Sequence, residues 1–363
     1  MRIYSENGAV GGLALGSKVG FSNTKKDMMV IKNKKALGFV WETMDPFLFC
    51  VHHEDAYPQG NKDLSPDASL DGRNIGQDFL LKDGWRMYHG HKVPGFPGHP
   101  HRGFETVTVV RKGMVDHTDS MGASGRYGDG DVQWMTAGKG IQHAEMFPMI
   151  NQDKGNSMEL FQIWLNLPKA NKFVEPHFKM LWSEDIPNHK ISNKEGEKIK
   201  IEVIAGDIES SKSPSPPPNS WANNPNNEVA IWNVEMDAHA VWGLPKASKG
   251  INRTIYFFKG DVLKLNKENL EVYHSAELVA DEAVTIYAGE EKACFLILQG
   301  KPIGEPVVQH GPFVMNTRQE IQQAFLDYQK TEFGGWPWED LDPVHGLGKG
   351  RFASHADGRK EMK

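Results

Sequence analysis

Two short pairs of metal-binding side chains constrain this chain more than any other feature of its sequence. His99 and His101 flank one proline, and His143 and Glu145 flank one alanine. On a β-strand, residues i and i+2 point to the same face, so each pair presents two donor groups side by side. Two such strands, facing each other across a barrel, would close four ligands around one ion. The sequence therefore predicts a β-fold built around a metal site.

The donor set indicates which ion such a site would hold. Imidazole nitrogens with a single carboxylate suit a first-row transition metal, and an ion that keeps open positions makes oxygen chemistry at Fe(II) accessible. A lone His-x-His motif is weak evidence, but a second pair in a β context favours metal binding, and a purely structural metal stays an alternative. The other histidines, His117 among them, show no comparable paired donor. The exception is His89 and His91, a weaker candidate pair.

The residues around these pairs have the patterns of strands and turns. β-Branched and alternating residues predict strands at 105–110, 114–118, 131–135 and 161–167, with turns between them. Residues 168–172 break the pattern, and a second β series then covers 198–205, 228–236, 252–258, 284–288 and 293–298. Within this series, 210–227 is dense in Ser, Pro and Asn and predicts an exposed irregular loop.

Composition narrows the class of protein. A length of 363 residues is enough for two domains with separate cores. A net charge of −6 gives no support to direct nucleic-acid binding. The two cysteines, Cys50 and Cys294, are too few for a disulfide scaffold and fit a reducing compartment. Since residues 1–8 lack the apolar core of a signal peptide and no run reaches membrane-spanning length, we expect a cytoplasmic protein without a membrane association.

Three segments of the sequence resemble one protein family closely. Residues 99–106 (HPHRGFET) and 131–146 (DVQWMTAGKGIQHAEM) are similar to the two signature blocks of the pirin family. Residues 305–316 (EPVVQHGPFVMN) resemble the C-terminal segment of that family. The resemblance extends from about Asp45 to about Tyr328, which is most of the chain.

The resemblance implies an all-β fold of two tandem cupin (jelly-roll) β-barrels with few short helices. The break at 168–172 places the boundary between a metal-binding cupin domain over 1–170 and a second cupin domain over 171–330, followed by a C-terminal extension over 331–363. Since no His-x-His or His-x-Glu pair recurs in the second half, we expect the second domain to be metal-free. The resemblance also implies non-haem iron, with another divalent transition metal as an alternative, bound by His99, His101, His143 and Glu145. Glu105 lies outside the ligand set of the family.

Two segments depart from the family pattern. An insertion of roughly 54–92 enters just before the metal motif, where we expect it to cap the site, alter the substrate or form an oligomer contact. The extension after Phe333 has the composition of a surface-wrapping tail with disorder at its last few residues. Before it, Thr317 and Glu320 form a capping box that predicts a helix with apolar residues at 321, 324, 325 and 328.

The resemblance implies an activity like that of quercetin 2,3-dioxygenase. Since a metal with an open position lowers the pKa of a bound hydroxyl, a nearby carboxylate can take its proton, and we expect Glu145 or Glu105 to be that catalytic base. A flat aromatic substrate would lie against side chains that serve the barrel core equally well: Phe96, Phe104, Trp134 and Met135. Two alternatives stay open. One is a redox-sensitive iron protein that binds a transcription factor or an enzyme, and the other is a bicupin with a structural metal.

Overall fold

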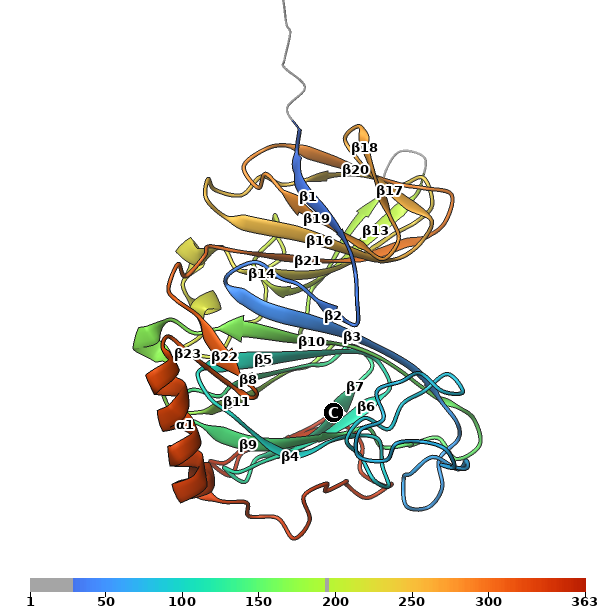
Figure 1. Cartoon of the computed structure of the whole chain (residues 1–363). Coiled ribbons are helices and arrows are strands. Elements are labelled where there is room, and N and C mark those ends of the chain that lie inside the picture. Colours follow the sequence, from blue (N-terminus) through green and yellow to red (C-terminus); the bar gives the residue numbers. More distant parts are fainter. Residues whose placement is uncertain (1–28, 193–195) are drawn as a thin grey trace, which may run out of the picture.

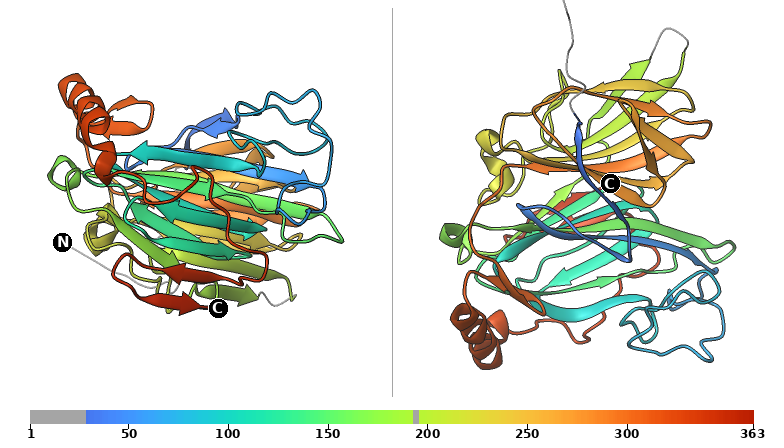
Figure 2. Two further views of the ribbon diagram at one scale, coloured as in Figure 1. Left: turned by 90° about the horizontal axis from the view of Figure 1, so that it is seen from below. Right: turned by 45° about the horizontal axis from the view of Figure 1, so that its top comes forward.

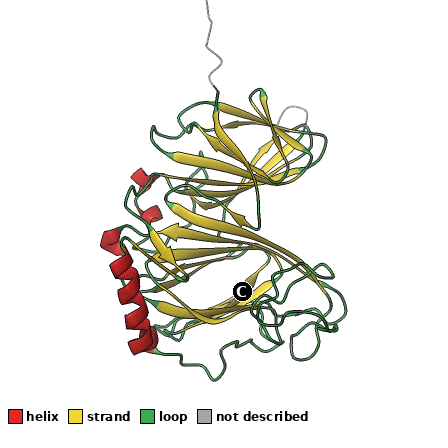
Figure 3. Ribbon diagram, in the orientation of Figure 1, coloured by secondary structure: helices red, strands yellow, loops and turns green. Residues whose placement is uncertain are grey.

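Two β-barrels, each formed by two facing sheets, make up the chain in this computed structural model (Figure 1). The structure describes residues 29–192 and 196–363, so the N-terminal residues 1–8, on which the absence of a signal peptide was predicted, lie outside the described residues. The predicted all-β class is confirmed, because strands dominate and one α-helix occurs within the described residues (Figure 3). None of the described helices is long and apolar enough to cross a membrane.

The first barrel is the lower one in Figure 1. One of its sheets has the strand order β11-β8-β5-β10-β3-β2, and the facing sheet has the order β25-β24-β7-β6-β9-β4. The strands of the first sheet are β2 (Val40–Trp41), β3 (Phe47–Tyr57), β5 (Phe104–Lys112), β8 (Val132–Thr136), β10 (Asn156–Asn166) and β11 (His177–Leu181). Those of the second are β4 (Gly95–His101), β6 (Met114–Asp119), β7 (Ser124–Gly128), β9 (Ile141–Met146), β24 (Phe352–Ser354) and β25 (Lys360–Met362).

The second barrel pairs a seven-stranded sheet with a four-stranded one. The larger sheet contains β1 (Ile31–Ala36), β12 (Asn188–Ser192), β13 (Lys198–Ala205), β14 (Ala230–Met236), β16 (Asn252–Lys259), β19 (His274–Leu278) and β21 (Ala293–Gly300). The smaller contains β15 (Val241–Leu244), β17 (Val262–Leu265), β18 (Glu268–Glu271) and β20 (Val284–Ala288). The five strands predicted for this half of the chain all form, with small differences at their ends.

The two barrels pack through their largest sheets. Every second side chain of β5 and β10 points away from the interior of the first barrel, and Val107 and Phe161 are examples. These side chains pack in one apolar cluster with residues of the second barrel such as Ile231 and Leu296. We call this cluster the inter-barrel core. Because each fully buried side chain of this size contributes about 1.5–3 kcal/mol, the contact is a true core rather than a loose domain interface. The two cysteines, Cys50 and Cys294, are free and buried in it.

Strand pairing differs from the predicted domain boundaries in three places. Strand β1, predicted within the first domain, pairs with β19 of the second barrel. Strand β11, predicted within the second domain, pairs with β8 of the first. The C-terminal extension returns to the first barrel, where β24 pairs with β7 and β25 pairs with β24, as the red strands in Figure 2 show. The prediction of disorder at the last residues is therefore wrong, since 360–362 form a strand.

The other described elements are one helix, a short hairpin and four 3-10 turns. Helix α1 (Arg318–Thr331) begins at the predicted capping box of Thr317 and Glu320, and it packs on the hairpin of β22 (Val308–His310) and β23 (Phe313–Met315). The predicted loop at 210–227 contains the 3-10 turns η2 (Trp221–Asn223) and η3 (Pro225–Asn227). Two more such turns are η1 (Lys169–Asn171) and η4 (Glu332–Gly334). The loop is less exposed than predicted, because Ser220 is buried.

Candidate metal centre

The two predicted donor pairs lie on neighbouring strands. β4 carries His99 and His101, β9 carries His143 and Glu145, and His99 is directly opposite His143 in the antiparallel register. We expected the two strands to face each other across the barrel, and this expectation is wrong, because β4 and β9 belong to one sheet. Cross-strand partners have Cβ atoms only about 5 Å apart, so adjacency still brings the donors together.

The three histidines form a compact group. One nitrogen of each ring lies within 4.8 Å of those of the other two. The ring centroids of His99 and His143 are 4.5 Å apart, and that of His101 lies 4.7 Å from His99 and 4.9 Å from His143. An ion with bonds of about 2.0–2.2 Å holds its donors at most about 4 Å apart, so small ring rotations would fit the group to one ion.

The hydrogen bonds of these rings leave nitrogen atoms free to bind a metal ion. His99 Nδ1 lies 2.8 Å from the Pro97 carbonyl oxygen, which can only accept, so Nδ1 carries the proton and Nε2 is bare. His101 Nδ1 and both ring nitrogens of His143 are buried without a hydrogen-bond partner among the described residues. Buried polar atoms without partners are rare because each costs about 1–3 kcal/mol. The group therefore fits a bound cation.

Glu145 connects this group to the facing sheet. Its carboxylate lies 3.8 Å from His143 Nε2, accepts a hydrogen bond of 3.2 Å from the Gln162 amide, and lies 2.9 Å from the Thr108 hydroxyl. Thr108 and Gln162 come from β5 and β10 of the opposite sheet. The carboxylate is thus held across the barrel interior, beside the histidines.

Burial sets the protonation of the group. Loss of hydration lowers the pKa of His99 to about 4 and places the pKa values of His101 and His143 well below their ordinary value. The imidazoles are therefore neutral at pH 7, which is the form that binds metals. Burial also raises the pKa of Glu145, so this carboxylate is a stronger proton acceptor than an exposed one.

Sequence reasoning missed one member of this sheet face. His117 on β6 lies directly opposite Glu145, and its ring centroid is 5.5 Å from that of His143. It is fully buried, with Nε2 3.3 Å from Asp119 Oδ2. His117 and Asp119 are themselves an i, i+2 pair on a strand, so the pattern that identified the other donors was present here too.

Glu105 does not reach the histidines. It occupies the other face of β5 from Thr108, where it accepts hydrogen bonds of 2.6 Å from the Thr136 hydroxyl and 2.5 Å from the Ser220 hydroxyl. Ser220 comes from the loop of the second barrel, and the burial of Glu105 raises its pKa to about 7. The prediction that Glu105 is a candidate base is not supported, because its contacts place it between the barrels.

A cavity of about 630 Å³ opens beside His99, His101 and Glu145. Alternate residues of β3 and β10 form its walls, among them Val51, Leu160 and Trp164, and the predicted wall residue Phe96 is present. The other three predicted wall residues lie elsewhere. They are buried in packing clusters of the fold: Phe104, Trp134 and Met135.

The predicted insertion contributes to this cavity. Phe79, His89 and His91 line it, so the weaker His-x-His pair of the sequence lies at the pocket although it is not part of the three-histidine group. His89 Nδ1 lies 2.8 Å from the Gly76 carbonyl oxygen, within the same segment. Of the three roles expected for the insertion, capping the site is the one that these contacts support, and the effect on the substrate and the oligomer contact stay predictions.

Known proteins match both barrels. Residues 31–165 fit the model of the pirin family, and residues 231–334 fit the model of the pirin C-terminal cupin domain. The chain belongs to the pirin family. Human pirin is 36% identical over 261 residues, which cover 70% of this chain and 82% of human pirin.

Some relatives of this pirin-family chain are named as dioxygenases. A Pseudomonas aeruginosa protein, whose name assigns it provisionally as a quercetin 2,3-dioxygenase, is 36% identical over 241 residues, which are 66% of this chain and 79% of that protein. A crystal structure named quercetin 2,3-dioxygenase, from Acinetobacter baumannii, has a TM-score of 0.66 and 25% identity, and the match covers 84% of this chain and 98% of that one. The predicted pirin membership and cupin fold are confirmed.

Proposed function

We propose that this pirin-family protein binds one divalent transition metal, Fe(II) in the first instance, and oxidises a flavonol of the quercetin type or a related phenol with molecular oxygen. His99, His101, His143 and Glu145 would hold the ion. The observation that carries the proposal is that His99, His101 and Glu145 line a cavity with aromatic walls, beside His143, whose two ring nitrogens have no hydrogen-bond partner among the described residues. A structural metal would need no such access.

The cavity suits a flat aromatic molecule. Its volume of about 630 Å³ falls within the range of about 300–1,000 Å³ that small-molecule sites occupy. Apolar rings of Phe96, Phe147 and Trp164 form much of its wall, and the donor groups of His99, His101 and Glu145 also line it. A substrate would thus place its hydroxyl group at the histidines and its ring against the apolar wall.

The residues of the chain divide the chemical work. A metal ion with an open position supplies Lewis acidity and a site for oxygen. Glu145 is the carboxylate beside the histidines, and we propose that it takes the proton of the substrate hydroxyl, since its burial raises its pKa. Thr108 and Gln162 hold that carboxylate in place. Leu160 and Trp164 limit the access of water to the reacting end of the cavity.

The test is oxygen uptake by protein reconstituted with Fe(II) under anaerobic conditions, with and without quercetin. We expect uptake that depends on quercetin and disappears in His143→Ala. The matched control is His274→Ala in the second barrel, which should keep the wild-type rate because His274 lies on β19, away from the cavity. Iron binding without uptake would refute the enzyme and favour the regulatory or structural alternative. The cytoplasmic location stays a prediction.

A further inference from the structure

One wall of the cavity contains His53, which is not one of the proposed metal ligands. Strand β3 turns Phe49, Val51 and His53 toward the cavity, whereas the neighbouring His52 points to the inter-barrel core and stacks on Phe161. The His53 ring is 4% exposed and makes edge contacts with Phe39 and Phe96, at centroid distances of 5.8 and 5.9 Å.

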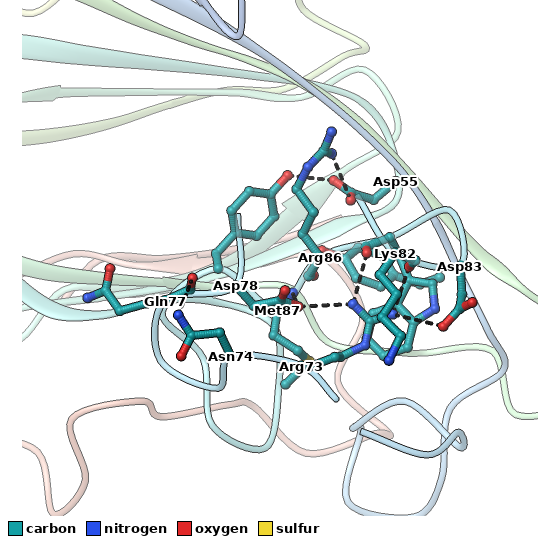
Figure 4. Close-up of polar contacts among 12 residues, drawn as sticks. Asp55, Arg73, Asn74, Gln77, Asp78, Lys82, Asp83, Arg86 and Met87 are labelled. Atoms are coloured by element: carbon teal, nitrogen blue, oxygen red, sulfur yellow. Dashed lines mark hydrogen bonds and ion pairs between the residues drawn. The ribbon is translucent and has the colours of Figure 1, made fainter. Parts of the chain in front are cut away.

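A chain of hydrogen bonds fixes the protonation of His53. The Tyr88 hydroxyl donates to Asp55 Oδ2 at 2.6 Å, and Arg86 donates to Asp55 Oδ1 at 3.0 Å, as the dashed lines of Figure 4 show for the labelled pair. The one proton of the Tyr88 hydroxyl is thus committed to the carboxylate. His53 Nδ1 lies 2.8 Å from the same hydroxyl oxygen, which is left to accept, so Nδ1 must donate.

The other ring nitrogen of His53 is therefore a bare acceptor. Burial lowers the pKa of His53 to about 3, so the ring is neutral at pH 7 and carries its one proton on Nδ1. None of the described hydrogen bonds engages Nε2, and the residue lines the cavity. A ring this weakly basic is poorly suited to removing a proton, but its Nε2 can accept a hydrogen bond from a ligand.

The segment that supplies Tyr88 is held rigidly although it has no regular strands. Tyr88 and Asp78 exchange two backbone hydrogen bonds of 2.8 and 3.0 Å. The buried Arg73 donates to Asp78 and to the carbonyl oxygens of Lys82 and Trp85, at 2.8 to 3.0 Å, and Figure 4 shows it at the centre of the segment. Tyr88 is thus positioned by the insertion, and its hydroxyl cannot easily turn away from Asp55 and His53.

Aromatic rings surround the acceptor. Phe79 of the insertion lies 6.4 Å from both Phe39 and Phe96, and Phe147 lies 6.1 Å from Phe96, all in edge-on or tilted geometry. Such a group of ring edges and faces favours another aromatic ring. An acceptor that lacks a partner within an apolar wall penalises any ligand that cannot donate to it.

We propose that His53 is a specificity-determining residue, and that it selects aromatic substrates bearing a hydroxyl group which donates to Nε2. Tyr88 and Asp55 are positioning residues that keep the tautomer, and Phe79 of the insertion completes the surrounding aryl subsite with Phe39, Phe96 and Phe147. The inference rests on the proposed function in one respect, namely that the cavity is the substrate site. It adds how the chain selects that substrate class: a hydroxyaryl compound would contact His53 and the insertion as well as the metal-binding residues.

The binding test uses two probes that differ in one proton donor, 2-naphthol and 2-methoxynaphthalene. Their affinities for the Fe(II)-loaded full chain are measured anaerobically by calorimetry. We expect a preference of about tenfold or more for 2-naphthol, which is the effect of one hydrogen bond to a desolvated acceptor. His53→Phe should reduce the preference severalfold, and the control His52→Gln should keep it. An unchanged preference in His53→Phe, or binding of neither probe, would overturn the proposal.

A second measurement begins with the wild-type protein and does not depend on activity. Nitrogen-15 NMR of the wild-type histidine rings should show His53 protonated at Nδ1 and bare at Nε2, and Tyr88→Phe should disturb that signal and weaken the preference for 2-naphthol. A proton on Nε2 in the wild type would contradict the proposal. Selection of the hydroxyl probe without quercetin-dependent oxygen uptake would refute the dioxygenase and leave this inference standing.

Discussion

In the second barrel, the space between the sheets is filled by apolar side chains, of which Ile255, Leu263 and Phe295 are fully buried examples. In the first barrel, one sheet turns four histidines and two carboxylates into the same kind of space, and a cavity opens beside them. Within the described residues, the three-histidine group is the one cluster with metal-binding spacing. The same architecture therefore serves as packing in one barrel and as a site in the other.

The comparison shows which residues lower the stability of the first barrel. Its buried imidazole nitrogens have no partners among the described residues, and such atoms cost about 1–3 kcal/mol each. The inter-barrel core and the second barrel offset that cost, because both consist mainly of large, buried hydrophobic side chains.

The largest effect is expected on metal affinity. His101→Ala should weaken metal binding by more than about 100-fold, since loss of a residue that only orients a ligand already costs about 10–100-fold. The metal content of purified protein, measured after equilibration with a chelating buffer, tests this. The matched variant His274→Ala in the second barrel should keep full occupancy. Full occupancy in His101→Ala would remove His101 from the ligand set.

The second effect concerns the stability of the apolar barrel. Phe295→Ala should lower the free energy of unfolding by about 3–5 kcal/mol, because the residue is fully buried and its neighbours cannot fill the space. Denaturant unfolding gives this value. The metal bound per folded molecule should stay unchanged, so a variant that folds but no longer binds metal would show that the two barrels are coupled more closely than we propose.

A smaller effect, of opposite sign, is expected in the metal-free first barrel. His143→Leu should stabilise it by about 1–3 kcal/mol at pH 7, since it removes two buried nitrogens that lack partners. The pKa of His143 is lower in the folded chain than in the unfolded one, so the unfolded state binds more protons below about pH 6.5 and the histidine destabilises further as the pH falls. Unfolding measured at pH 7 and pH 5 should show a larger difference at pH 5, and a constant difference would contradict this account.

The smallest effect is expected at the contact between the barrels. Glu105→Gln should leave metal content unchanged and turnover within about twofold, because Glu105 bonds to Thr136 and Ser220 rather than to the metal centre. A loss of one hydrogen bond of this kind is worth about 1 kcal/mol of stability. Steady-state oxygen uptake at pH 7 is the measurement. A tenfold loss of turnover with normal metal content would restore Glu105 as a catalytic base.

How far the sequence predicted the site depended on the range of the interaction. The i, i+2 spacing of His99 with His101 and of His143 with Glu145 is local, and strand geometry alone placed each pair on one face. The same rule places Glu105 and Thr108 on opposite faces of β5. If Thr108 is assigned to the interior of the first barrel, the rule predicts that Glu105 points away from it. His117 with Asp119 also follows the rule and was overlooked.

What the sequence did not predict is long-range pairing. The partners of β1, β11 and β24 are chosen by side-chain contacts with strands far away in the chain, and no local pattern records them. The same holds for the insertion, whose composition does not reveal that Phe79 and Tyr88 return to the cavity. The adjacency of β4 and β9 depended on such pairing as well, and we predicted it incorrectly.

The central claim is that His99, His101 and His143 bind one metal ion at the cavity. X-ray absorption spectroscopy of the Fe(II)-loaded chain tests it most directly, because imidazole rings produce a characteristic multiple-scattering pattern. The account predicts one iron per chain with three imidazoles, and two imidazoles in His101→Ala if that variant is forced to bind at high metal concentration. Iron surrounded by oxygen donors with no imidazole scattering would contradict it.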